Sequence, residues 1–196
     1  MSKLSDLQAL VIQHAAGLYE RLKFDHQELT IECNTQQYFE LLLTLRDTVD
    51  LHFQQLIDLC GIDYLAYKNQ WHEERRYAVV VHLLSITHNW RVRVRAFIDD
   101  NDLPIIASVI SIYACANWYE REAFDMYGII FKNHPDLRRI LTDYNFVGYP
   151  LRKDFPISGA MEMVYDDKQK RVVYQPVSIE PRNNVPKVVR EEEYGE

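Results

Sequence analysis

Two neighbouring apolar runs constrain the fold of this chain more than any other feature. In Trp90–Ile98, WRVRVRAFI, every second residue is apolar and the first three intervening positions are arginines, which is the period of a strand with one buried face. The preceding run Tyr77–Ile86, YAVVVHLLSI, is β-branched and almost continuously apolar, as expected of a strand covered on both faces. Residues Thr87–Asn89 between them suit a turn. The two runs therefore predict an antiparallel hairpin within a sheet.

The arginines of the second run have three interpretations. Arg91, Arg93 and Arg95 leave the same face of the predicted strand. A basic ladder beside Trp90 can bind nucleic acid, whereas cations on a solvated strand face discourage edge pairing. The chain has 22 Lys and Arg against 29 Asp and Glu, a net charge of −7, so we favour the solvated face and expect no nucleic acid partner. A docking face for an acidic partner stays open as the third interpretation.

The residues before this hairpin predict three helices and a strand. Apolar residues recur at helical spacing from Leu4 to Leu22, which predicts an amphipathic first helix. Glu28–Cys33 alternates as a strand does. Asn34 is a suitable N-cap with Gln37 as its capping-box partner, so a second helix should follow. We expect that helix to bury Phe39, Leu42, Leu43 and Leu45, and we expect a further short helix from Leu51 that ends at Gly61.

The residues after the hairpin return to a helical pattern. From Ile105 the spacing is helical, and a helix is predicted from about Ala116 to Tyr127, ended by Gly128. Ile129–Phe131 is typical of a short strand, and His134 with Pro135 predicts the start of another short helix. The fold class that follows is α+β: a mixed or antiparallel sheet flanked by helices, with an extended C-terminal tail.

The composition changes after Pro156. Residues 157–196 contain Pro176, Pro181 and Pro186 and few bulky apolar residues, so this segment cannot bury a core of its own. Its residues 163–176 suit a hairpin, which is barely stable alone in water. We therefore predict a folded domain over residues 1–156 and an extended tail over residues 157–196 that becomes ordered on a partner protein.

Motifs for metal, nucleotide or nucleophilic chemistry are absent from the sequence. The seven histidines form no i,i+4 pair, and Cys33, Cys60 and Cys115 lie far apart without CxxC spacing. The six glycines form neither a GxGxxG nor a Walker loop, and there is no GxSxG elbow. We expect no catalytic, cofactor-binding or metal-binding residue. The uncharged residues 103–119 are too few for a spanning helix, and no signal peptide is evident, so we expect a soluble cytoplasmic protein.

Charged residues concentrate between Asn117 and Phe155. This segment holds six acids and six bases, so its charges balance. A solvated surface does not require balance, whereas ions near or below the surface do, because an unpaired buried charge is costly. Arg121 and Asp125 lie one helical turn apart and are expected to pair.

Two roles suit these ions. Glu120 or Glu122 with His134 would serve general acid and base chemistry. Alternatively, the ions brace a corner between a strand, a helix and a loop. We favour the structural role, because no nucleophile, metal ligand set or cofactor cradle accompanies them.

Residues Glu120–Leu141, EREAFDMYGIIFKNHPDLRRIL, resemble the signature of the thirty-kilodalton subunit of respiratory complex I. In bacteria that family is the C-type subunit of proton-translocating NADH:quinone oxidoreductase. The resemblance extends to Leu56–Tyr64, to Ala116–Trp118, to Gly148–Pro156 and to the VVYQPVSIEPR stretch of the tail. It implies interface residues at Glu120, Arg121, Glu122, Asp125, Gly128, His134, Pro135, Asp136, Leu137, Arg138, Arg139, Arg152 and Asp154.

The resemblance also implies a place in a larger enzyme. That enzyme, a translocase of the respiratory chain, passes electrons from NADH through FMN and iron–sulfur clusters to quinone. On this basis the chain is a non-redox scaffold of the hydrophilic arm, and FMN and the clusters lie in partner subunits. It would contact the large quinone-site subunit, which is the D-type, and lie near the cluster-bearing B-type and I-type subunits. It would be peripheral on the cytoplasmic side of the inner membrane, held there only through the complex. The equivalent subunit of a membrane-bound hydrogenase-type complex is the alternative.

Overall fold

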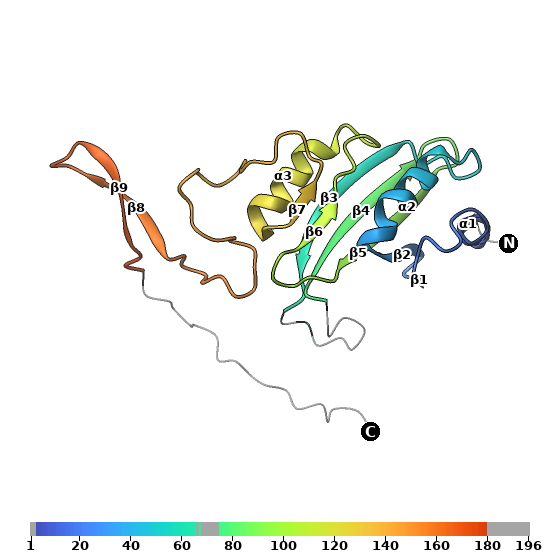
Figure 1. The fold of residues 1–196 in the computed structure, drawn as a ribbon, viewed down its shortest axis with the longest axis horizontal. Coiled ribbons are helices and arrows are strands. Elements are labelled where there is room, and N and C mark those ends of the chain that lie inside the picture. Colours follow the sequence, from blue (N-terminus) through green and yellow to red (C-terminus); the bar gives the residue numbers. More distant parts are fainter. Residues whose placement is uncertain (1–2, 66, 68–74, 180–196) are drawn as a thin grey trace, which may run out of the picture. The chain divides into compact units, whose positions relative to one another are not determined.

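A computed structural model of the chain describes residues 3–65, 67 and 75–179. The chain divides into two units, Met1–Phe155 and Pro156–Glu196. The first unit contains a five-stranded sheet with strand order β1-β2-β5-β4-β3 (Figure 1). Its strands are β1 (Arg21–Asp25), β2 (Glu28–Asn34), β3 (Gln55–Asp63), β4 (Tyr77–Ser85) and β5 (Trp90–Ile98).

The predicted hairpin lies in the interior of this sheet. β4 and β5 pair antiparallel, with Val81 opposite Val94, and the predicted turn joins them. β2 and β5 pair in parallel, whereas β1 with β2 and β3 with β4 are antiparallel. The sheet is therefore mixed, and with its helices it confirms the predicted α+β class.

The arginines on β5 meet carboxylates on the adjacent strand. Arg93 pairs with Glu28, and Nη1 of Arg95 lies 3.3 Å from Oε1 of the buried Glu32. Arg91 alone of the three is exposed. Because two of the three guanidinium groups already have carboxylate partners in the same sheet, this face is not a free basic platform for phosphate groups.

The described residues of the first unit form three helices. The capping box is confirmed, because Oδ1 of Asn34 accepts hydrogen bonds from the backbone N–H groups of Gln36 and Gln37, both at 3.0 Å. Oε1 of Gln37 in turn accepts the N–H of Asn34. The third helix is confirmed with its predicted bounds, and Gly128 ends it at a φ of 75°. The helices are α1 (Lys3–His14), α2 (Thr35–Asp47) and α3 (Ala116–Tyr127).

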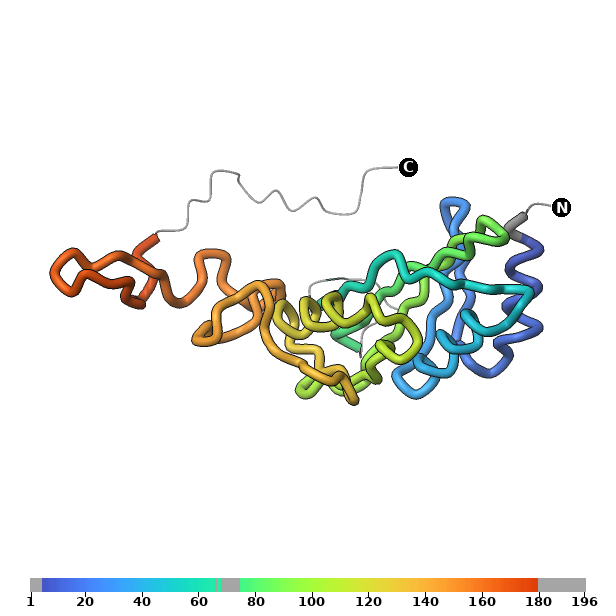
Figure 2. Tube along the Cα trace, turned by 90° about the horizontal axis from the view of Figure 1, so that it is seen from above, coloured from blue at the N-terminus to red at the C-terminus, as the bar shows by residue number. Residues whose placement is uncertain are grey.

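The hydrophobic core lies between the helices and one face of the sheet. Figures 1 and 2 show α2 and α3 on the same side of the strands. The predicted buried face of α2 is partly wrong, because Phe39 and Leu43 are only half-buried. The residues that α2 buries are Tyr38, Leu41, Leu42 and Leu45, which follow the i, i+3, i+4, i+7 spacing of a core-facing stripe.

Two predicted helices before β4 are wrong in part or entirely. The first helix ends at His14 and does not reach Leu22, because the chain turns at Gly17, where φ is 82°, and then forms the edge strand β1. The segment predicted as a helix ending at Gly61 is the strand β3. A register shift between Leu56 and Asp58 interrupts its alternation, so the buried Leu56 and Leu59 stand three residues apart, as they would on a helix.

Two further predictions after β5 need correction. Residues from Ile105 begin with the strand β6 (Ile105–Ala107), which pairs in parallel with β7 (Ile130–Lys132); the predicted short strand is thus confirmed within one residue. No helix begins at His134 and Pro135. The chain turns there instead, with Asn133 at a φ of 69° and Nδ1 of His134 accepting the N–H of Asp136 at 3.0 Å.

The second unit contains one hairpin among its described residues. β8 (Met161–Asp166) and β9 (Arg171–Pro176) pair antiparallel, which confirms the predicted hairpin. In the part of the chain that the structure describes, no helix is long and apolar enough to cross a membrane.

Candidate functional site

Asp125 stands at the centre of the signature segment. This side chain on α3 is completely buried, and its carboxylate accepts five hydrogen bonds. Oδ2 accepts the backbone N–H groups of Ile140, Leu141 and Thr142 at 3.0, 2.7 and 2.8 Å. Oδ1 accepts from the Thr142 hydroxyl and from Nη1 of Arg139. Burial raises the pKa of Asp125, but the bonds from Thr142 and the backbone outweigh it and lower this pKa to about 2.

Arg139 fixes the same loop from the other side. Its Nη1 lies 2.8 Å from Asp125 and 3.0 Å from the Thr142 hydroxyl, while Nη2 donates to the carbonyl of Gly148 at 3.0 Å. The guanidinium also lies 5.4 Å from the centre of the Tyr149 ring. A forked donor that also contacts an aromatic ring restricts the loop at several points at once.

Arg121 does not pair with Asp125, contrary to the expectation from helical spacing. It is almost completely buried, and it donates to the backbone carbonyls of Arg138 at 3.1 Å and Arg139 at 3.2 Å. The carboxylate of Asp125 is already occupied by loop N–H groups. The two side chains of α3 therefore bind complementary backbone groups of one loop, carbonyls at residues 138 and 139 and N–H groups at residues 140 to 142.

Arg152 closes the C-terminal end of α3. Its Nε donates to the carbonyl of Tyr127 at 2.7 Å, and its guanidinium lies 4.4 Å from the Tyr149 ring centre and 5.1 Å from that of Tyr77. A Cβ at Gly128 would lie 2.6 Å from Nη2 of Arg152 and 2.7 Å from the Tyr149 ring. Gly128 is therefore required both for its positive φ and for the space that Arg152 occupies.

A second ion cluster joins the sheet to the loop. The buried Asp63 accepts hydrogen bonds from Nε and Nη2 of Arg76 at 3.0 and 2.8 Å, and from the backbone N–H of Lys153 at 2.8 Å. Arg76 also lies 2.9 Å from Asp154. Burial raises the pKa of Asp63, but the bonds from Arg76, Lys153 and Leu65 bring it below its usual value. Sequence reasoning missed Asp63 and Arg76 as site residues, although Asp63 lies in the Leu56–Tyr64 segment of the resemblance.

The residues of the alternative acid and base site do not come together. Oε2 of the buried Glu120 accepts the Ser108 hydroxyl at 2.6 Å, and Oε1 accepts the N–H of Val109 at 2.7 Å. Glu122 is exposed, and Nε2 of His134 donates to the carbonyl of Asn117 at 3.1 Å. Among the described residues no hydrogen bond joins these three side chains. Burial raises the pKa of Glu120 to about 7.

The remaining signature residues lie nearer the surface. Arg138 forms an exposed pair with Asp136 at 2.8 Å and donates to the Tyr144 hydroxyl at 3.3 Å. Pro135 and Asp154 are exposed, and Leu137 is half-buried against the core. The predicted set thus separates into inner and outer groups. We define the charged corner as the inner ions of the predicted set, together with Asp154, which Arg76 contacts, and the two residues that the sequence did not predict, Asp63 and Arg76. Its members are Asp63, Arg76, Glu120, Arg121, Asp125, Arg139, Arg152 and Asp154.

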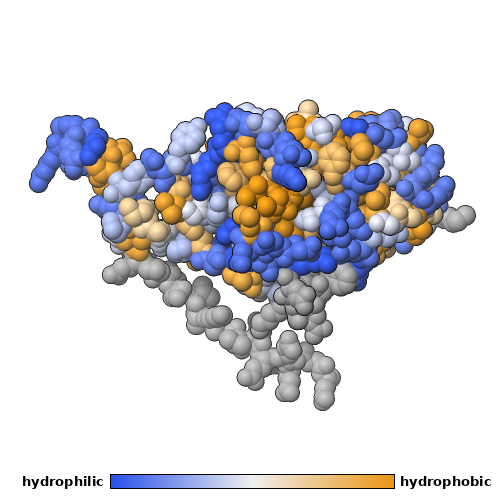
Figure 3. All heavy atoms as spheres, viewed as in Figure 1, coloured by the Kyte–Doolittle hydropathy of each residue, from blue (hydrophilic) through white to orange (hydrophobic). Residues whose placement is uncertain are grey.

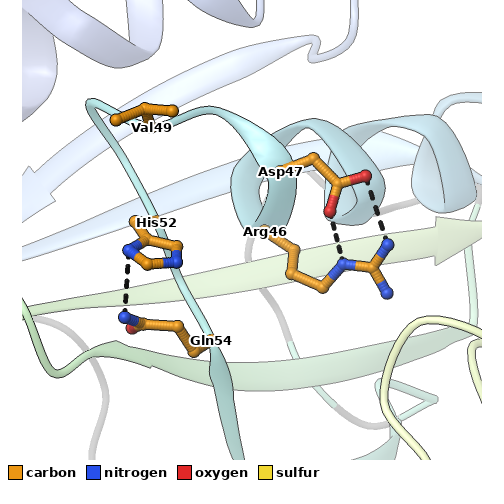
Figure 4. A pocket seen from close by; sticks show the side chains of 5 residues that line it. All are labelled: Arg46, Asp47, Val49, His52 and Gln54. Carbon is orange, nitrogen blue, oxygen red and sulfur yellow. Dashed lines mark hydrogen bonds and ion pairs between the residues drawn. The ribbon is translucent and has the colours of Figure 1, made fainter.

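A pocket of about 440 Å³ lies at the end of α2, and its polar groups bind one another (Figure 4). Arg46 meets both carboxylate oxygens of Asp47, at 2.6 and 3.1 Å, and Nδ1 of His52 accepts from Gln54 at 3.0 Å. None of the residues that line it belongs to the charged corner. Over residues 3–65, 67 and 75–179, no group of three or more His, Cys, Asp and Glu side chains is placed to hold a metal ion.

Curated proteins resemble this chain over most of its length. The model of the family "Respiratory-chain NADH dehydrogenase, 30 Kd subunit" matches residues 31–161. The C-type NADH-quinone oxidoreductase subunit of Neisseria meningitidis serogroup B is 60% identical over 168 residues, which are 86% of this chain and 85% of that protein. The protein of the same name from Ralstonia nicotianae is 53% identical over 193 residues, 98% of this chain and 96% of that protein.

Solved structures share the fold. A trypsin-resistant fragment (1-134) of Nqo5 matches with a TM-score of 0.58 and 27% identity, covering 67% of this chain and 98% of the fragment. A chain of the membrane-bound sulfane sulfur reductase, an archaeal respiratory membrane complex, matches with a TM-score of 0.65 and 22% identity. That second match covers 80% of this chain and 87% of the other, and at its identity it shows a common fold alone.

Proposed function

Since this chain belongs to the family of the respiratory-chain NADH dehydrogenase 30-kDa subunit, we propose that it is a structural subunit of a proton-translocating NADH:quinone oxidoreductase, without a redox centre of its own. FMN and the iron–sulfur clusters then belong to partner subunits. The chain contacts the large quinone-site subunit, lies near the cluster-bearing B-type and I-type subunits, and is peripheral on the cytoplasmic side of the inner membrane. Its contribution is to hold redox subunits at the spacing that electron transfer requires.

The geometry of the charged corner supports a structural role. The buried ions Asp125 and Arg121, and the partly buried Arg139, all bind partners within this chain, mostly backbone groups of one loop. A catalytic acid or base needs access to a substrate proton, which these atoms lack. Satisfied buried ions instead fix a single conformation of the segment that they bind.

That segment presents apolar side chains outward, and this is the observation that carries the proposal. We call residues 137–151 the docking loop. Its Leu141, Tyr144 and Val147 are 64%, 77% and 80% exposed, and the corner binds the backbone of this loop at residues 138–142 and at Gly148. On α3, Trp118 is exposed as well. Neighbouring large apolar and aromatic side chains that are exposed to water are typical of protein interfaces.

The surface around α3 agrees with an interface. Figure 3 shows an apolar area over α3, β6 and β7 that is surrounded by hydrophilic residues. An apolar centre with a polar rim is the usual anatomy of a contact between two subunits. A counterpart in a membrane-bound hydrogenase-type complex remains the alternative, but the 53% and 60% identities are to NADH-quinone oxidoreductase subunits.

The test compares Arg139→Ala with Lys23→Ala in cells that lack the native copy. Removing one partner of a buried ion pair destabilises by about 3–5 kcal/mol, so Arg139→Ala should lower the amount of assembled complex severalfold. NADH:quinone activity of the membranes should fall in the same proportion. Lys23 is an exposed cation on β1, outside both the charged corner and the apolar area over α3, β6 and β7, and its substitution should change neither quantity. Normal assembly with a collapse of activity per complex would instead make Arg139 part of the chemistry.

A further inference from the structure

A side chain of the hairpin itself stabilises the turn between β8 and β9. Oδ1 of Asp166 accepts the backbone N–H groups of Lys168 and Gln169 at 2.8 and 3.1 Å, and Lys170 adopts a φ of 53°. These bonds lower the pKa of Asp166 and support a tight turn between β8 and β9. The register of the two strands is therefore defined, and with it the two faces of the hairpin.

One face of the hairpin, which we call the apolar face, carries only aliphatic and aromatic residues. Side chains alternate along each strand, so Met163 and its cross-strand partner Tyr174 point to the same side, together with the pairs two residues away. The other side is mixed: Glu162 accepts from Gln175 at 2.6 Å and from Ser178 at 2.9 Å, Asp166 stands opposite Arg171, and one apolar pair, Val164 with Val173, lies between them. The apolar face consists of Met161, Met163, Tyr165, Val172, Tyr174 and Pro176.

This apolar face is open to solvent. Its five residues other than Pro176 are between 43% and 62% exposed. A two-stranded sheet has no core and is marginal in water, so such a face gains most from a covering surface. Methionine and tyrosine suit that role, because both are enriched where one protein packs against another and methionine adapts its shape to the partner.

We propose that the apolar face of the β8–β9 hairpin docks on an apolar, uncharged surface of a neighbouring subunit of the complex. This inference rests on the proposed function and adds a second contact that does not involve the docking loop. An uncharged partner surface is required, because a charge brought against Met163 or Val172 would lose its water without gaining a hydrogen bond.

The small area of the face favours a neighbouring subunit over a second copy of this chain. Six-residue strands are about 20 Å long and lie about 5 Å apart, so each hairpin face offers on the order of 200 Å². Two copies face to face would bury on the order of 400 Å², well below the roughly 1,200 Å² of a stable interface. A subunit that already binds another part of this chain can use a much smaller second contact. The two surfaces are then held close together, so the second contact forms as it would within one molecule.

Adjacent residues of β8 provide a matched pair of variants. Met163→Glu places a charge on the apolar face, and Val164→Glu places the same charge on the opposite face of the same strand. Both change an apolar residue to glutamate one position apart, so their effects on strand propensity are similar. Each variant is introduced as the tagged full-length chain, and co-purification of partner subunits from solubilised membranes is quantified.

We expect Met163→Glu to lower partner recovery about tenfold, as substitutions at the centre of an interface do. Val164→Glu lies on the opposite face and should change partner recovery by less than about twofold. Equal losses from both variants, or no loss from either, would overturn the inference.

The melting temperature and mass of the purified chain are measured as well. A change in either with Met163→Glu alone would mean that the face is covered by this chain or by a second copy. If Arg139→Ala detaches the chain from the complex while Met163→Glu does not, the result supports the proposed function and contradicts the hairpin contact.

Discussion

Two carboxyls on α3 show how burial and hydrogen bonding compete at the scale of single residues. Asp125 and Glu120 are both completely buried. Asp125 receives five hydrogen bonds, one of them from a guanidinium, and its pKa falls to about 2. Glu120 receives two, from Ser108 and Val109, and burial raises its pKa to about 7. The hydrogen bonds that each carboxylate accepts, set against its burial, decide which carboxyl remains ionised at neutral pH.

Glu120 should make the stability of the first unit depend on pH. Because its pKa in the folded chain lies above the usual 4.5, its contribution is fully present below pH 4.5 and is lost as the pH rises through about 7. The difference corresponds to at most about 3 kcal/mol at pH 8. Glu120→Gln, which cannot ionise, should therefore raise the free energy of unfolding at pH 8 and change it little at pH 5.

Urea unfolding of the purified chain at both pH values measures this effect. Glu122→Gln is the matched control, since Glu122 is an exposed carboxyl on the same helix. It should leave the difference between the two pH values unchanged. A Glu120→Gln variant whose stability shifts equally at pH 5 and pH 8 would show that ionisation of this group does not affect folding.

At the scale of elements, α2 offers the clearest local test. Asn34 accepts two backbone N–H groups at the start of this helix, so Asn34→Ala should lower the free energy of unfolding by about 1 kcal/mol. Asn34→Ser keeps a side-chain acceptor and should restore most of the loss. Thermal melting of both variants measures the difference, and equal destabilisation by Ala and Ser would show that the cap bonds contribute nothing.

The elements that the sequence predicted well are those with local signals. The capping box at Asn34, the alternation of Trp90–Ile98 and the glycine that ends α3 each act within a few residues. The strand β3 was missed because its bulge breaks the two-residue period, and β1 was missed because an edge strand exists only through its pairing with β2.

The same distinction applies to the candidate site. Helical spacing placed Arg121 and Asp125 on one side of α3, but their partners come from residues 138 to 142, which no periodicity identifies. The Lys153 N–H that binds Asp63 is 90 residues away in sequence. A balanced count of acids and bases predicted that partners exist; the partners themselves depend on tertiary packing.

At the scale of the whole molecule, the charged corner uses residues up to Asp154, just before the division of the chain into two units. Asp125, Arg121 and Asp63 all bind groups from residues 138 to 153. The first unit therefore needs this segment to satisfy its buried ions, whereas none of these bonds involves a residue after Pro156. In the related Nqo5, a fragment (1-134) resists trypsin, which agrees with a folded N-terminal part in that protein.

Truncation at two positions tests how much of the chain the core requires. A chain ending at Pro156 should melt cooperatively, because every buried ion of the corner keeps its partner. It keeps the docking loop but loses the second contact, so it should recover the large quinone-site subunit about tenfold less well, or worse. A chain ending at Asp136 loses Arg139 and Thr142, which leaves Asp125 buried without a cation, and it should lose cooperative melting. Calorimetry of the purified chains measures both outcomes. If the chain ending at Pro156 also fails to melt cooperatively, residues 157–196 contribute to the core and are more than a partner-binding tail.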